Sequence, residues 1–155
     1  MSTICWNASR RRARLSRRPS VPAPIWYDYA IVRVVPRPER EEFINVGVIL
    51  SSVTARILEA RIEFDEARLR ALDPTADLVQ IRAHLQTIPL ICAGGAAAGA
   101  LGRLSQRERF HWLTAPRSAV IQTSAVHAGR CEDPLRALDH LVRTMLHVAA
   151  RPGAT

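Results

Sequence analysis

The chain has 155 residues, of which 48% are hydrophobic, and it carries 22 basic against 14 acidic side chains. That length and hydrophobic fraction suffice for one core of ordinary size, which excludes a mini-protein and a fully disordered chain. All the basic residues are Arg, which is typical of a GC-rich bacterial genome. No run of about 18 apolar residues occurs, so the sequence predicts no membrane-spanning helix.

The first 25 residues differ sharply from the rest. They hold six Arg and no acid, and they end in Pro19, Pro22 and Pro24. Residues 26–155 hold 16 Arg against all 14 acids, so the high net charge belongs mainly to the first segment. We predict a disordered basic arm over residues 1–25, followed by one domain over residues 26–150. The arm is expected either to bind phosphates without sequence specificity or simply to be solvated.

Two runs rich in β-branched and aromatic residues, 27–35 and 43–50, flank a polar segment with Pro36 and Pro38. This pattern predicts an antiparallel hairpin with a long, stiff connection. Both faces of the first run are largely apolar, which predicts a central strand. Residues 56–64 alternate apolar and mostly charged side chains, which predicts a third strand. The sheet therefore begins as a three-strand meander.

The middle of the chain indicates helices. Asp65 is expected to cap a short helix over residues 66–72. A stripe of apolar residues at helical spacing predicts a second helix over residues 75–88, ended or bent by Pro89. Residues 93–102 are Ala and Gly with a single Leu. They lack the Lys-Ser/Thr of a phosphate-binding loop, so we predict a flexible loop there.

The last third of the chain is expected to add one strand and two helices. Ser105 and Glu108 have the spacing of a capping box, which predicts a helix over residues 106–113. A fourth strand is predicted over residues 118–124, and residues 126–132 are assigned to a loop. Asp133 and Pro134 then begin a final amphipathic helix. The expected fold is α+β, with an antiparallel sheet of about four strands packed with about four helices.

Candidate binding residues fall in two segments. In the first, Arg33 on the opening strand accompanies Glu41, Glu42 and Asn45 near the start of the second strand. The simpler interpretation is a cross-strand ion pair between Arg33 and Glu42, which contributes little to stability when exposed. The alternative is an acid-lined site.

The second segment contains Arg109, His111, Trp112, Arg117 and Gln122. Two guanidinium groups could bind a phosphate or carboxylate through paired hydrogen bonds. His111 is the candidate catalytic residue, because imidazole can act as a general acid or base near neutral pH. The structural alternative places the aromatic residues in the core and pairs the two Arg with carboxylates elsewhere.

Other chemistry has little support in the sequence. Cys5, Cys92 and Cys131 show no metal-ligand spacing, and we expect reduced thiols in a cytoplasmic protein. Neither Cys92 nor Ser118 has a nearby base or a nucleophile-elbow motif. We expect no metal and no cofactor.

Three blocks, YDYAIVRVVPRPEREEFINVGVIL, EARIEFDEARLRALDP and ERFHWLTAPRSAVIQTSAVHAG, together resemble the bacterial DUF3037 family, a domain of unknown function. The resemblance runs from about residue 27 to residue 147 and leaves out the basic arm. It implies a short, soluble bacterial protein. Some members of the family are encoded beside HipA-like kinase-type proteins. The family has no agreed activity, so it supplies no catalytic residues.

Three functions follow as hypotheses. The first is a non-enzymatic interaction module that binds another protein, such as a HipA-like kinase-type protein, through the face around Arg109, Trp112 and Arg117. The second is a nucleic-acid-binding or anion-binding protein that uses Arg109, Arg117 and the basic arm. The third is a metal-independent enzyme with His111 as acid or base.

Overall fold

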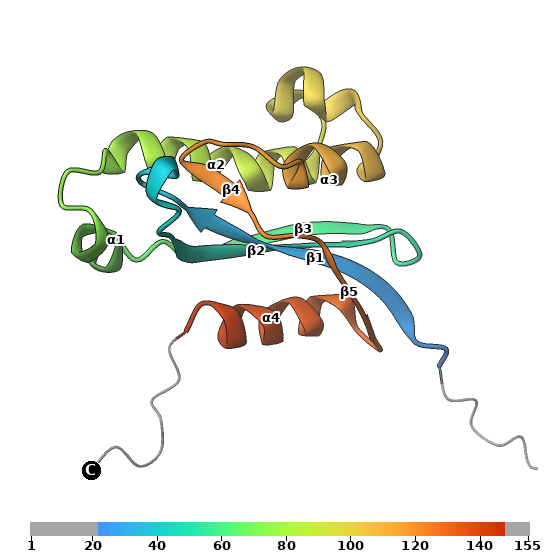
Figure 1. The fold of residues 1–155 in the computed structure, drawn as a ribbon. Coiled ribbons are helices and arrows are strands. Elements are labelled where there is room, and N and C mark those ends of the chain that lie inside the picture. The colour runs from blue at the N-terminus through green and yellow to red at the C-terminus, as the bar shows by residue number, and fades with distance from the viewer. Residues whose placement is uncertain (1–21, 148–155) are drawn as a thin grey trace, which may run out of the picture.

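A computed structural model describes residues 22–147, and its centre is a five-stranded antiparallel sheet (Figure 1). The strand order is β3-β2-β1-β4, and β5 also pairs with β1. The strands are β1 Ile25–Val34, β2 Ile44–Ser52, β3 Ile57–Ile62, β4 Ile121–Thr123 and β5 His127–Cys131. The predicted opening meander and the central position of the first strand are confirmed, because β1 has β2 on one side and both short strands on the other.

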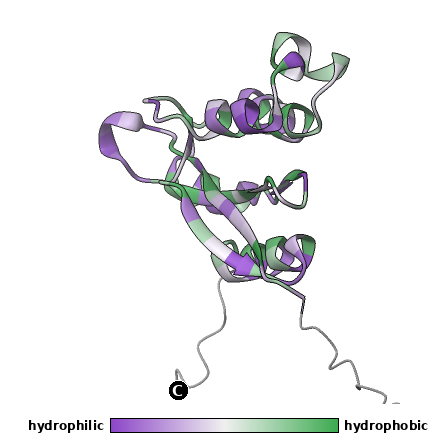
Figure 2. Ribbon diagram, turned by 90° about the vertical axis from the view of Figure 1, so that its right-hand side faces the viewer, coloured by the Kyte–Doolittle hydropathy of each residue, from purple (hydrophilic) through white to green (hydrophobic). Residues whose placement is uncertain are grey.

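Helices cover both faces of the sheet. The α-helices are α1 Glu66–Leu72, α2 Leu78–Ala93, α3 Gln106–Thr114 and α4 Pro134–Met145, and two 3-10 helices are η1 Pro38–Arg40 and η2 Ala96–Arg103. Figure 2 shows the sheet from the side, between a layer with α2 and α3 and a layer with α4. The predicted α+β fold is therefore confirmed, with one strand more than expected.

The alternation along β1 explains why both faces need a cover. Val32 and Val34 point into the core cluster beneath α2 and α3, whereas Tyr27 and Tyr29 pack against the cluster beneath α4. Strand β2 behaves in the same way, because all but one of its residues are buried. Successive side chains of a strand point to opposite faces, so an apolar run of this length requires a layer on each side.

The second helix differs from its predicted bounds. It begins at Leu78, where Asp77 accepts a hydrogen bond from the backbone N–H of Gln80 at 3.0 Å, and it continues through Pro89 to Ala93. A proline inside a helix costs about 3 kcal/mol. Burial of Ile91 and Cys92 after the proline offsets that cost, because a fully buried aliphatic side chain gains about 1.5–3 kcal/mol.

Two segments predicted as loops have regular structure. Most of residues 93–102 lies in η2. Gly94 and Gly95, just before η2, and Gly99, inside it, have positive φ angles. The segment assigned to a loop at residues 126–132 contains β5. Its sequence, HAGRC, has no apolar alternation, and the strand exists because it pairs with residues 25–29 of β1.

The predicted basic arm of residues 1–25 lies outside the described residues except for its last four, and Ile25 already belongs to β1. Within residues 22–147, no helix is by itself long and apolar enough to cross a membrane. Helices α2 and η2 pass that test only when they are joined across a bend of 63°.

Candidate binding site

Three of the predicted site residues come together in one surface groove. Arg33 projects from β1, Arg117 lies in the segment after α3, and Gln122 lies on β4. We call this hollow the arginine groove. Its lining residues are Arg33, Val35, Pro38, Glu41, Phe43, Pro116, Arg117, Ser118 and Gln122. The pairing of β1 with β4 places Arg33 directly opposite Gln122, so the sheet itself creates this meeting of distant residues.

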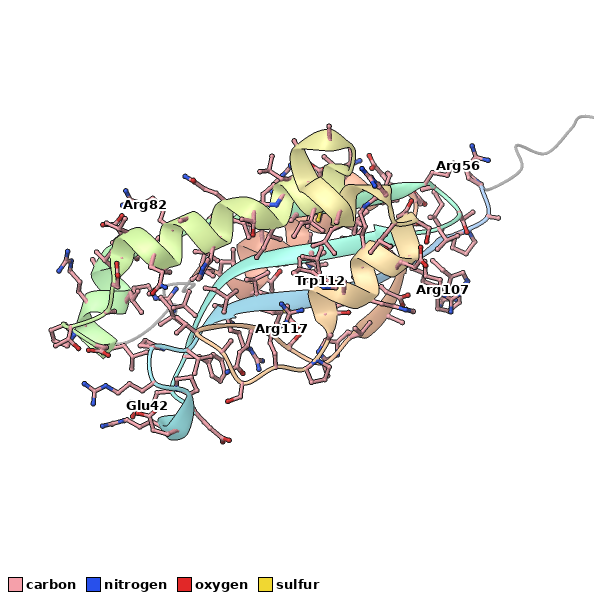
Figure 3. All side chains as sticks on the ribbon, turned by 90° about the horizontal axis from the view of Figure 1, so that it is seen from above. Glu42, Arg56, Arg82, Arg107, Trp112 and Arg117 are labelled. Carbon is pink, nitrogen blue, oxygen red and sulfur yellow. The ribbon has the colours of Figure 1, made fainter. Side chains whose placement is uncertain are left out.

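Each arginine of the groove lies against an aromatic ring. The Arg33 guanidinium carbon is 4.2 Å from the centre of the Phe43 ring, and that of Arg117 is 4.6 Å from the centre of the Trp112 ring. The two aromatic residues are 44% and 41% exposed. Figure 3 shows Trp112 and Arg117 next to each other beside α3. Stacking of this kind is attractive and restricts a flexible side chain to one orientation.

The charges of Arg33 and Arg117 are not neutralised by ion pairs with any residue in the described range 22–147. Arg117 donates hydrogen bonds to the carbonyls of Trp112 and Ala115. The Nε of Arg33 is shielded from solvent without a hydrogen-bond partner. Packing and stacking therefore hold Arg33 in place.

Glu41 supplies the one acidic side chain among the residues that line the arginine groove. Its backbone has a φ of 56°, in the left-handed region, where it caps η1. Such a conformation costs a non-glycine residue about 1–2 kcal/mol, and strained residues cluster at functional sites. With two cations against one carboxylate, the groove keeps a net positive charge that suits an anion.

A second hollow adjoins the groove, between α2, the end of α3 and β4. We call it the apolar pocket. It has a volume of about 520 Å³, within the range of about 300–1,000 Å³ that is usual for ligand sites. Its lining residues are Gln80, Ile81, His84, Thr87, Ile88, Ile91, Trp112, Leu113, Arg117, Ala119, Val120, Ile121, Gln122 and Thr123. Arg117 and Gln122 line both hollows.

The part of α2 that forms this pocket contains none of the residues that were predicted for a site. Gln80, His84 and Thr87 follow one another at helical spacing and line its rim. Residues separated by three or four positions share one face of a helix. This polar stripe beside buried isoleucines is the sequence pattern from which the pocket could have been predicted. Phe43 was also missed, because its contact with Arg33 depends on the pairing of β1 with β2.

The predicted ion pair between Arg33 and Glu42 is wrong. Glu42 accepts two hydrogen bonds from Arg40, at 3.0 and 2.9 Å, on the exposed connection before β2. This charge-assisted contact lowers the pKa of the Glu42 carboxyl. Arg33 instead lies opposite Asn45, next to an irregularity in the register between Val32 and Arg33. Glu42 lies outside the paired part of the strands and cannot reach across.

Asn45 and Arg109 have structural contacts. The amide of Asn45 donates to the Met145 carbonyl at 3.2 Å and so holds the last turn of α4. Arg109 donates to the Leu104 carbonyl at 2.6 Å and to the Cys92 carbonyl at 3.4 Å. Arg109 therefore does not join Arg117, and the predicted pair of cations is replaced by Arg33 and Arg117.

His111 lies on the exposed side of α3, with its ring centre 6.4 Å from that of Phe110. It lines neither the arginine groove nor the apolar pocket. Burial, with a smaller contribution from Glu59, raises the pKa of the Cys92 thiol to about 12, which keeps this residue protonated at neutral pH. Among the residues that the structure describes, no three His, Cys, Asp or Glu side chains gather to hold a metal ion.

The comparisons with known proteins identify a family and no relative of known activity. A family model described as a protein of unknown function, DUF3037, matches residues 29–146. This range agrees with the extent expected from the sequence blocks. Neither the curated proteins nor the solved structures contain a match.

Proposed function

The chain belongs to the DUF3037 family, and we propose that this member is a non-enzymatic accessory module that binds an acidic segment of another protein in the arginine groove. The observation that carries the proposal is that the guanidinium groups of Arg33 and Arg117 line one groove, and that each is stacked on an exposed aromatic ring. Arginine is the residue best suited to paired hydrogen bonds with carboxylates.

The surroundings of these residues favour a protein partner. Trp, Tyr and Arg dominate the energetic centres of protein interfaces, and Trp112 and Arg117 lie together here. Because their side chains are already oriented, less conformational entropy is lost on binding. A guanidinium stays charged at every physiological pH, so it supplies fixed charge rather than proton transfer. The groove thus suits binding better than acid–base catalysis.

The identity of the partner is also a proposal. A HipA-like kinase-type protein is the class that the family resemblance implies, and co-purification of the two proteins from cells that express both would test it. We place the module in the bacterial cytoplasm, where the free thiols of Cys92 and Cys131 would stay reduced. A role of the basic arm in nucleic-acid binding remains a prediction for residues outside the described range.

The direct test uses a fluorescently labelled peptide of alternating Glu and Gly as the probe. We expect the double variant Arg33→Gln/Arg117→Gln to weaken its binding by about tenfold or more, since two charge-assisted contacts are lost. The matched control is Arg107→Gln/Arg143→Gln, which removes the same charge from exposed positions on α3 and α4. Neither control side chain lines the arginine groove.

Equal weakening in both double variants would show that only net charge matters, and it would overturn the proposal. A single-stranded DNA oligonucleotide of equal charge supplies the second probe. If the DNA binds more tightly than the peptide and ignores Arg33 and Arg117, the protein is a nucleic-acid binder instead. Deletion of residues 1–21 would then lower the affinity and its salt dependence.

A further inference from the structure

The apolar pocket extends the arginine groove beyond simple charge recognition. We infer that the pocket takes a large apolar side chain from the same acidic segment, so that the partner motif pairs an apolar residue with a nearby carboxylate. This inference rests on the proposed function, because it assigns the second half of one binding site. It specifies the chemistry of the segment, which charge alone leaves open.

The walls of the pocket determine what can enter. Its inner surface is built from aliphatic residues of α2, α3, β4 and the position just before β4, namely Ile81, Ile88, Ile91, Leu113, Ile121 and Val120. All six belong to the main core cluster or pack against it. The pocket is therefore an opening onto the hydrophobic core, and covering it with an apolar group removes that surface from water.

Charge limits the occupant further. Arg117 carries the only fixed charge among the described residues that line the apolar pocket, and no carboxylate is among them. A cationic side chain would meet Arg117 without a compensating acid, and an anion deeper inside would lose its hydration. An uncharged apolar group with a carboxylate at the mouth suits both surfaces.

Continuity joins the two hollows. Arg117 and Gln122 line both of them. A partner segment that contacts Arg117 is therefore next to the groove and the pocket at once. Neighbouring residues of an extended chain are about 3.3 Å apart, and successive side chains point in opposite directions. One extended segment can thus place an acidic residue in the groove and an apolar residue in the pocket. Trp112, at 41% exposure, offers its ring to the same segment.

The experiment uses short capped peptides that contain one Phe and one Glu, separated by no residue, one residue or two. Binding is followed by chemical-shift changes in the full-length protein. We expect the best spacing to lose about tenfold in affinity when Phe becomes Ser, and a similar amount when Glu becomes Gln. The shifts should involve residues of the apolar pocket, such as Thr87 and Val120.

A pair of variants on α2 tests the location. His84→Trp fills the rim of the pocket from an exposed position, whereas Gln86→Trp places the same bulk on the same helix outside the pocket. We expect His84→Trp to abolish the preference for Phe over Ser while the dependence on Glu persists. Gln86→Trp should leave both unchanged. Neither substitution enters the core, so both variants should fold.

The outcomes separate this inference from the proposed function. If Phe and Ser peptides bind equally well while Glu still matters, the pocket is not used and the inference is wrong, although the groove keeps its role. If His84→Trp and Gln86→Trp have the same effect, the apolar contact lies elsewhere and the inference is also wrong. If Glu has no influence at any spacing, the proposed function itself fails.

Discussion

Each end of α3 has an arginine beside it, and the two arginines have different roles. At its N-terminal end, Ser105 and Glu108 form a capping box. The side-chain amide of Gln106 there donates to the carbonyls of Ser52 and Ile57, at 3.1 and 2.8 Å. Arg109 follows one turn later. At the other end, Trp112 and Arg117 stack on each other and remain exposed.

The carbonyl groups around each guanidinium explain the difference. Arg109 reaches Cys92 in the last turn of α2 and Leu104 at the end of η2. The last carbonyls of a helix have no partner inside the helix and carry partial negative charge, so one half-buried side chain caps two helix ends. Arg117, which follows α3 in the chain, donates only to the carbonyls of Trp112 and Ala115 at the end of that helix, and its exposed side chain still lines the groove. An arginine is thus structural or available according to what surrounds it.

Removing Arg109 should have the largest effect on stability. We expect Arg109→Ala to lower the free energy of unfolding by about 2 kcal/mol, because two carbonyls lose a charged donor. Urea denaturation at pH 7 measures this loss, with Arg107→Ala on the same helix as the control. A loss no larger than that of the control would show that the Arg109 contacts do not stabilise the fold.

Replacing Gly94 should have the next largest effect on stability, since this residue packs directly against the Arg109 side chain. Its φ of 72° and ψ of −164° define a conformation that favours glycine, and a Cβ there would lie 3.0 Å from the Arg109 guanidinium carbon. We expect Gly94→Ala to cost about 1–2 kcal/mol. In an Arg109→Ala background the cost should shrink, because the close contact disappears while the backbone strain remains. A double-mutant cycle from urea denaturation measures this coupling, and strictly additive losses would contradict it.

The capping box should give a smaller effect that depends on pH. Ser105→Ala is expected to cost about 1 kcal/mol at pH 7. Hydrogen bonds from the Ser105 side chain and backbone lower the pKa of the Glu108 carboxyl. The contribution of the Glu108 carboxylate to stability is therefore complete above the unfolded pKa of about 4.3. It is lost as the pH falls through the lower pKa of the folded state.

Glu108→Gln should remove this acid sensitivity at one site. The neutral amide can still accept a hydrogen bond from Ser105, so its contribution does not titrate. Urea denaturation of the two proteins between pH 6 and pH 3 measures the difference. Parallel stability curves over that interval would contradict the role of Glu108.

Arg117 should have the smallest effect on stability and a large one on binding. We expect Arg117→Ala to change the free energy of unfolding by about 0.5 kcal/mol or less, because its contacts are exposed. The same variant should lower the affinity for the acidic peptide severalfold. Fluorescence anisotropy and urea denaturation on one preparation test both statements. A stability loss equal to that of Arg109→Ala would remove the distinction between the two ends.

Features that depend on neighbouring residues were predictable from the sequence. Asp65 accepts a hydrogen bond from the backbone of Arg68, and the Ser105–Glu108 box forms as expected. Local spacing carries that information. The bounds of α2 and the existence of β5 were not predictable, because burial after Pro89 and pairing with β1 decide them.

The candidate site divides in the same way. Arg33, Arg117 and Gln122 were selected as polar residues among apolar ones, yet nothing local showed that they share a groove. Glu42 and Arg109 have the same character in the sequence. However, Glu42 is hydrogen-bonded to Arg40, and Arg109 is hydrogen-bonded to carbonyls at helix ends.

The sequence by itself determined an α+β domain whose first strand lies at the centre of the sheet, because apolar periodicity records which faces must be buried. It also marked the arginines and aromatic residues from which a site could be built. Only the tertiary structure decided which guanidinium groups remained available. That depends on carbonyls and rings brought close by the pairing of β1 with β2 and β4, and by the packing of α2 against α3. Electrostatic and hydrogen-bond partners are set by distance in space, which the order of residues along the chain does not specify.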